Sequence, residues 1–213
     1  MSKKIRIWWI KSNIRIKIAM VWWIWWSNLY QKIEKKFMKT DISSVKTWVE
    51  DKRDYSDDKL AYETPRTAWS LYCGRNELYH YKKDKWYMLY DVISTPSRMM
   101  VRKGVDCDDY SFLSYFYFDS FINFDDKVYE FDGFYSIIWK NGSGHSIAIW
   151  KNPLKKDDYL MISNAQCVNI SNIRRAWNLK GYGGIRSIAK YGFKDKKLIL
   201  RDIDYNETDY IDD

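Results

Sequence analysis

CDDYSFLSYFYFDSFINFDDKVYEFDGFYSIIWK, residues 107–140, is the stretch that decides the fold. From Cys107 through Phe121 it combines aromatic and small polar side chains in one long run, which predicts a largely buried helix. Beyond Asp125 the chain turns to β-branched and aromatic residues, which are typical of strands. Runs of the same kind follow at residues 144–151, 158–164 and 197–203. Helices followed by an antiparallel sheet predict the α+β class.

The N-terminal half of the chain predicts further helices. Leu29, Ile33 and Phe37 recur every four residues, as on one face of a helix. Thr64–Pro65 and Thr95–Pro96 each place an N-cap residue before a proline, which is favoured at the first helical position. We therefore expect two helices to begin at these prolines.

The composition excludes several classes of protein. The length of 213 residues suits one domain with an appendage. Hydrophobic residues make up 46% of the chain and aromatic residues 18%, which excludes a disordered scaffold. The three cysteines are odd in number and far apart, so a disulfide framework is not expected. Two histidines and three cysteines also lack the paired spacings of zinc fingers and ribbons.

The net charge of +8 is concentrated at the N-terminus. Residues 1–40 contain ten Lys or Arg and one acid, which leaves 26 of the 36 bases and 27 of the 28 acids for the rest. At the other end, residues 201–213 hold six acids and one Arg. We therefore divide the chain into a basic, Trp-rich arm at residues 1–27, a folded domain at residues 28–200 and an acidic tail at residues 201–213.

The arm contains nine consecutive apolar residues, Ile18–Trp26. A membrane-spanning helix needs about 20 apolar residues, and Arg15 and Lys17 end this run early, so a single-pass helix is not expected. Trp beside Lys or Arg is typical of segments at a membrane interface, so we expect a membrane anchor or a docking arm for virion assembly. Two alternatives stay open: a cleaved secretory signal, and an amphipathic helix or strand that covers the core.

Cys107 is the residue best placed for chemistry because it opens the expected helix. The unpaired N–H groups and the dipole at a helix N-terminus stabilise a thiolate, which is the attacking form of cysteine. A histidine from another element would act as the base, and His145 heads the strand of residues 144–151. A third polar group would orient the imidazole, and the neighbouring strand supplies Ser163 and Asn164.

Three acids, Asp106, Asp108 and Asp109, surround this cysteine. Their negative charges would raise the pKa of the thiol unless a cation or a base neutralises them. Oxygen ligands clustered on a turn also suit a hard cation such as calcium. The acids therefore argue against an activated thiol or for a bound cation.

The segment ISTPSRMMVRKGVDCDDYSFL, followed by GSGHSIAIW and DDYLMISN, resembles the bacterial transglutaminase-like cysteine proteinases. In that family a Thr-Pro helix leads into a Gly-x-x-Asp-Cys-acid-Asp-Tyr motif, and a Gly-His strand follows. Here Thr95–Pro96, residues 104–110 and Gly144–His145 occur in the same order, with 38 residues from Cys107 to His145. The resemblance covers about residues 93–166, a third of the chain.

The resemblance implies a papain-like α+β fold in which the nucleophile, at a helix N-terminus, packs on an antiparallel sheet. It implies Cys107 as nucleophile and His145 as general base of a cysteine peptidase or amidase acting on a protein or peptide amide. The acyl-thioester would pass to water or to an amine, and the sequence does not choose between the two.

The third member of the site departs from the family, which has an Asp there. That position falls at Ser163 or, with a shift of one residue, at Asn164. Only one of two adjacent strand residues can face His145, and we expect Asn164. Some members of the family bind calcium through acids beside the nucleophile, which implies Asp106 and Asp108 as calcium ligands. No other cofactor is expected.

Three competing functions stay open. One is a cell-wall amidase or endopeptidase, which also uses Cys and His on such a fold. Another is a catalytically inactive transglutaminase-like domain that serves as a structural or binding protein of a bacteriophage virion or of a membrane. The last is nucleic-acid binding through the arm, which the neutral body and the apolar arm disfavour. The arm favours a location at the cell envelope, a membrane or a virion.

Overall fold

The computed structural model describes residues 13–38, 49, 65–75, 78, 80–81, 105–119, 121–124, 127–178, 181–194 and 197–207. The helix expected from Thr95–Pro96 lies outside these residues.

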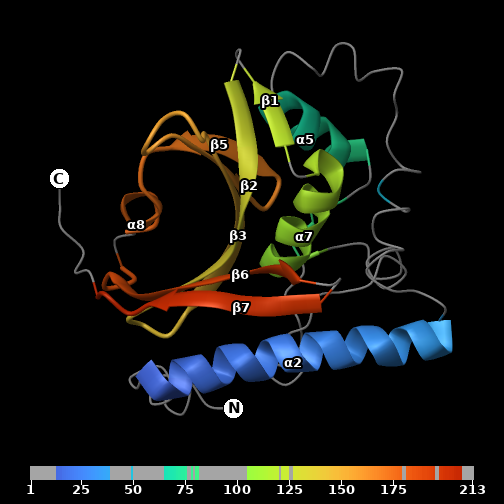
Figure 1. The fold of residues 1–213 in the computed structure, drawn as a ribbon, viewed down its shortest axis with the longest axis vertical. Coiled ribbons are helices and arrows are strands. Elements are labelled where there is room, and N and C mark those ends of the chain that lie inside the picture. Colours follow the sequence, from blue (N-terminus) through green and yellow to red (C-terminus); the bar gives the residue numbers. More distant parts are fainter. Residues whose placement is uncertain are drawn as a thin grey trace.

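The described chain forms one sheet with helices on both sides of it (Figure 1). The sheet has seven strands in the order β5-β4-β3-β2-β6-β7, with β1 paired to β2, and every strand pair is antiparallel. The strands are β1 (Phe121–Phe124), β2 (Lys127–Trp139), β3 (Gly144–Lys151), β4 (Tyr159–Ser163), β5 (Gln166–Ile170), β6 (Ile185–Lys194) and β7 (Lys197–Asp204). The helices are α2 (Asn13–Met38), α5 (Pro65–Arg75), α7 (Cys107–Phe118) and α8 (Ile173–Ala176).

The α+β class and the antiparallel sheet are confirmed, and two helix starts fall where the sequence places them. Helix α5 begins at Pro65 and helix α7 begins at Cys107. Helix α7 ends at Phe118, earlier than expected, because Phe121 already belongs to β1. Strands β1, β5 and β6 were not predicted. The three cysteines form no disulfide, as expected.

The two faces of the sheet carry two separate hydrophobic clusters. On the face covered by α5 and α7, which we call the α7 face, Phe112 stacks on Phe134 of β2 at 4.5 Å between ring centroids. On the other face, which we call the α8 face, Trp177 packs beside the buried Trp139 of β2, and Ile173 of α8 belongs to the same cluster. Figure 1 shows α7 and α8 on opposite sides of the strands. A side chain's place in the fold therefore depends on which way its strand residue points.

Helix α2 lies alongside β7 (Figure 1). The Asn28 side chain donates to the carbonyl oxygen of Leu198 at 2.9 Å and accepts from its N–H at 3.1 Å. Trp23 meets Tyr191 of β6 edge to face at 5.2 Å, and Ile24 is buried in the cluster of the α7 face. The helix runs through the expected boundary between arm and domain at residue 27, so the second half of the arm is packed on the core.

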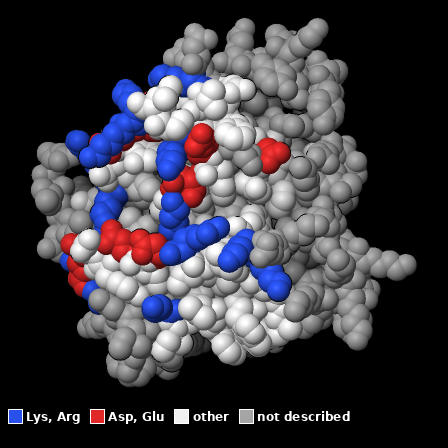
Figure 2. All heavy atoms as spheres, in the orientation of Figure 1, with Lys and Arg blue, Asp and Glu red and all other residues white. Residues whose placement is uncertain are grey.

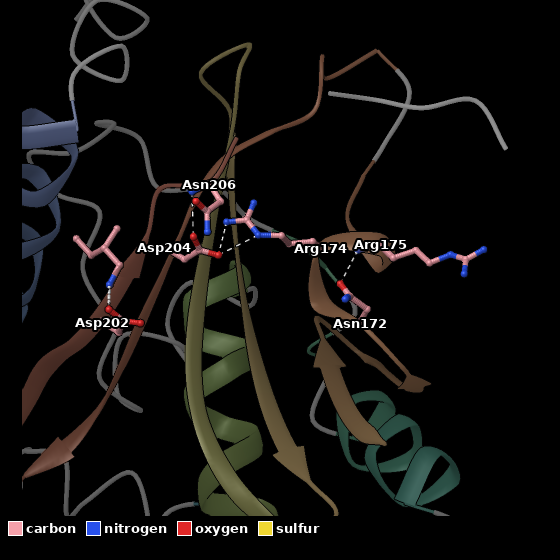
Figure 3. A network of polar contacts seen from close by, with 7 residues as sticks. Asn172, Arg174, Arg175, Asp202, Asp204 and Asn206 are labelled. Atoms are coloured by element: carbon pink, nitrogen blue, oxygen red, sulfur yellow. Dashed lines mark hydrogen bonds and ion pairs between the residues drawn. The ribbon is translucent and has the colours of Figure 1, made fainter. Parts of the chain in front are cut away.

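The beginning of the acidic tail is also part of the folded body, because β7 extends to Asp204 (Figure 3). The guanidinium of Arg174 on α8 donates to Asp204 at 3.0 Å from Nε, and the N–H of Asn206 donates to the same carboxylate at 2.9 Å. Although burial opposes ionisation, these two donors hold the pKa of Asp204 below its usual range. Glu207 pairs with Lys140 and Arg186. These contacts hold residues 204–207 against the sheet and α8.

Candidate functional site

Cys107 occupies the first position of α7, with Asp106 as the N-cap residue. Its side chain is partly exposed, whereas Cys73 and Cys167 are buried. Burial raises the pKa of the Cys73 thiol and raises the pKa of the Cys167 thiol to about 12. Cys107 is therefore the one thiol of the three that reagents in water can reach without unfolding.

The three acids beside the cysteine are buried and close together. One carboxylate oxygen each of Asp106, Asp108 and Asp109 lies within 4.8 Å of the others. Within the described chain, Oδ1 of Asp106 accepts no hydrogen bond. A buried carboxylate needs a compensating partner, and carboxylate oxygens are the ligands that calcium prefers. The donor set fits a hard cation, with Asp109 as a third ligand beside the two expected.

Hydroxyl groups, and no imidazole, face Cys107 from the sheet. Tyr191 of β6 is buried on the α7 face, and burial together with the negative charges of Asp108 and Cys107 raises the pKa of its phenol. The Tyr191 hydroxyl lies 3.1 Å from Oγ of Ser146 and 3.3 Å from Oγ of Ser136. None of these three hydroxyls is a base at neutral pH.

Tyr81 also interacts with the cysteine. Its backbone forms an isolated bridge with Val105, and a side-chain hydrogen bond joins Tyr81 and Cys107. Burial, followed by the charges of Cys107 and Asp106, raises the pKa of the Tyr81 phenol. The negative charges around the sulfur therefore disfavour ionisation of the neighbouring Tyr81 phenol.

His145 lies on the opposite side of the sheet. In β3, Ala148 and Trp150 belong to the cluster of the α7 face, whereas Ile147 and Ile149 belong to the cluster of the α8 face. The pairing of β3 with β2 is regular from residue 144 to residue 149, so His145 shares the direction of Ile147 and Ile149. The structure therefore does not bring His145 to Cys107. The expected pairing of Cys107 with His145 was therefore wrong. The next residue, Ser146, is the one that points toward α7.

The contacts of His145 are all with the α8 face. Its Nε2 lies 3.0 Å from Oγ of Ser163, and its ring centroid lies 4.6 Å from that of Trp177. Burial lowers the pKa of His145 to about 4, so the imidazole is neutral at pH 7. Strand β4 does supply a polar neighbour of His145, and it is Ser163 rather than the expected Asn164.

Asn164, the expected orienting residue, is the first residue of the turn between β4 and β5. It has a φ of 51°, and its carbonyl oxygen accepts a hydrogen bond of 2.8 Å from Nε1 of Trp69 on α5. Ser163 is the residue that faces His145, because it shares the direction of Met161 in the cluster of the α8 face. The expectation that Asn164 rather than Ser163 would face His145 was therefore wrong, again by one position along the chain.

Ser136, Ser146, Tyr81 and Tyr191 are the residues near Cys107 that sequence reasoning missed. Ser146 carried a signal, because it follows His145 directly and must point the opposite way in a strand. Tyr191 carried none, since β6 itself was not predicted.

Neither a family model, nor a curated protein, nor a solved structure matches the chain. The resemblance to transglutaminase-like proteinases and the papain-like core thus stay predictions. The structure establishes the α+β fold with an antiparallel sheet. Among the described residues, no helix combines the length and the apolar content needed to cross a membrane.

Proposed function

We propose that the protein is a non-catalytic binding or structural protein, built on a transglutaminase-like domain whose cysteine and histidine do not work together. One observation carries this proposal: Cys107, the first residue of α7, lies on the α7 face of the sheet, whereas His145 projects from the α8 face. A general base must lie within hydrogen-bond reach of the proton that it takes, or one water away. A packed sheet between the two side chains removes that route.

The surroundings of both residues support the same conclusion. His145 is buried, neutral and already in contact with Ser163. Cys107 lies beside three buried carboxylates, whose negative charges oppose a further negative charge on the sulfur unless a cation is bound. Hydrolysis by Cys107 and a histidine of β3 would require the histidine at position 146, which points toward α7, and not at position 145.

The acids at the start of α7 have a structural role in this proposal. Asp106 and Asp108, together with Asp109, would hold a calcium ion at the N-terminus of α7. The ion would neutralise three buried negative charges and would tie the N-terminal turn of the helix to the segment before it. The bound ion would supply stability and no chemical step.

Thiol chemistry provides the test. The full chain is incubated with fluorogenic peptide amides and with a primary amine as acyl acceptor, with and without calcium, beside the Cys107→Ala variant. We expect no turnover that differs between the wild type and this variant. Turnover that is lost in Cys107→Ala would overturn the proposal, and its loss in His145→Ala as well would show that the two residues act as a pair.

A thiol hydrolase acting on a protein or peptide amide is the second candidate. The observation that favours it is the partly exposed sulfur at a helix N-terminus. It requires a base other than His145, so activity would be lost in Cys107→Ala and kept in His145→Ala. Labelling with iodoacetamide at neutral pH should select Cys107 over Cys73 and Cys167 under either candidate, but a rate well above that of a free thiol is expected only for the hydrolase.

A further inference from the structure

Helix α2 has two apolar faces, and the sheet covers one of them. The buried face contains Ile16, Ile24 and Ser27, and beside it the Asn28 side chain is hydrogen-bonded to the backbone of Leu198 in β7. A helix that only covers a core needs a single apolar stripe. The second apolar face therefore indicates a binding partner outside the described fold.

The uncovered face is a regular stripe. Ile18, Val21, Trp22 and Trp25 are 53%, 49%, 49% and 50% exposed. Their spacing of three, four and seven residues places them on one side of an α-helix. Leu29 continues the same spacing and is partly buried. From residue 18 to residue 29 the stripe is about 17 Å long, at 1.5 Å per residue.

The indole rings of the stripe lie against one another. Trp22 and Trp25 are 5.1 Å apart between ring centroids, and Trp26 is 6.4 Å from Trp22 and 6.0 Å from Trp25. Trp is the residue most typical of the boundary between lipid headgroups and acyl chains, where its ring is in an apolar layer and its N–H meets polar groups. A cluster of indoles on a convex helix is suited to a flat boundary rather than to a pocket.

The charge of the helix indicates the sign of the partner. Residues 13–33 contain no Asp or Glu, and Lys17 is exposed next to the stripe. The helical positions that continue the stripe at its two ends are Arg15, Lys32 and Lys36. In Figure 2 the surface where α2 runs is largely uncharged with basic atoms and no acidic ones, whereas acids and bases alternate over the strands.

We propose that the stripe Ile18–Val21–Trp22–Trp25 of α2 docks the protein on an anionic membrane surface, with the helix lying parallel to that surface. Apolar side chains with basic residues at both ends are the composition of helices that lie in the interface of a bilayer. The sheet side of α2 stays packed on β7, so the folded body is carried above the membrane. The inference deepens the proposed binding role by naming its partner, and it does not depend on the state of Cys107.

The test uses the full chain with vesicles of phosphatidylcholine, with and without about one third of phosphatidylglycerol. Co-sedimentation should show binding to the anionic vesicles, weakening as salt is added. The double variant Trp22→Ser/Trp25→Ser should bind at least about tenfold more weakly. Lys17→Gln should bind about fivefold more weakly, as expected for one basic charge at a lipid surface.

The matched control is Leu154→Ser, which changes another exposed apolar residue, 96% exposed in the turn between β3 and β4. It should bind like the wild type. Circular dichroism should show that the double variant is still folded at the temperature of the assay, because both indoles lie outside the buried face of α2. Failure of the wild type to bind anionic vesicles, or equal binding by the double variant, would overturn the inference.

Two further outcomes separate the competing partners. The wild type could instead dimerise without binding vesicles, and the double variant could lose this dimerisation. That result would assign the stripe to a second copy of the chain and would overturn the proposed membrane docking. Amide turnover that depends on Cys107 would overturn the proposed non-catalytic function and would leave the vesicle result as it stands.

Discussion

As the pH falls, protonation of His145 should destabilise the protein at a higher pH than protonation of the paired carboxylates does. Burial lowers the pKa of His145 from 6.5 to about 4 in the folded protein. Between these values the unfolded chain binds the proton more readily than the folded chain does. The stability is therefore fully present above about pH 6.5 and is lost as the pH falls toward about 4.

The size of the effect follows from the two pKa values. At about pH 4.5 the linkage relation gives a loss of about 2.5 kcal/mol relative to neutral pH, which is a large part of the stability of a typical domain. The carboxylates of Asp132, Asp158 and Asp204 act in a lower range. Burial opposes their ionisation, but hydrogen bonds and basic partners hold their pKa values below 3.8, so their contribution is lost only at lower pH.

Urea unfolding followed by circular dichroism, at a series of pH values from about 7.5 to about 4.5, measures this loss. The matched variant is His145→Gln, whose amide can still donate to Oγ of Ser163 but does not titrate. The free energy of unfolding of the variant should be nearly constant over this range. If the wild type and the variant lose stability in parallel, His145 is not the titrating group and its buried, neutral state is refuted.

Three other predictions concern the cation site, the core and the tail. Calcium at about 100 times its Kd should raise the free energy of unfolding by about 2.7 kcal/mol. The variant Asp106→Asn, which keeps an N-cap oxygen, should lose this stabilisation in thermal unfolding. If neither calcium nor a chelator changes the stability of the wild type, the calcium site is contradicted. Phe134→Ala removes a fully buried ring stacked on Phe112 and should cost about 3 to 5 kcal/mol in urea unfolding, and a cost below about 1 kcal/mol would contradict the packing of α7 on β2. Arg174→Ala breaks a partly exposed ion pair with Asp204 and should cost at most about 1 kcal/mol; a larger loss would mean that the tail holds α8 in place.

Local sequence signals predicted the elements that carry their own start and stop residues. Pro65 after Thr64 located the start of α5, and the run of aromatic and small polar residues from Cys107 located the start of α7. Strand β3 was predicted at its observed bounds, Gly144–Lys151, because glycine precedes it and Asn152–Pro153 follows it. Such signals act over a few residues, so they are visible without knowledge of the fold.

Strand β6 was missed although Gly183 and Gly184 directly precede it. Residues 185–194 contain a glycine, two lysines and an arginine among the apolar residues, which hides the strand in a local pattern. Its pairing with both β2 and β7 in the sheet is what makes it a strand. Tyr191, which lies near Cys107, could not be identified for the same reason.

The sequence alone determined the residue types of the candidate site and the elements that hold them, namely a cysteine at the start of a helix and a histidine at the start of a strand. The tertiary structure alone decided that the two do not meet. The strand HSIAIW is apolar on both faces, with Ile147 and Ile149 on one and Ala148 and Trp150 on the other. Because helices cover both faces of the sheet, neither set of side chains is marked as solvent-facing, and only the packing of α7 assigns Ser146 to the cysteine and His145 to the far side.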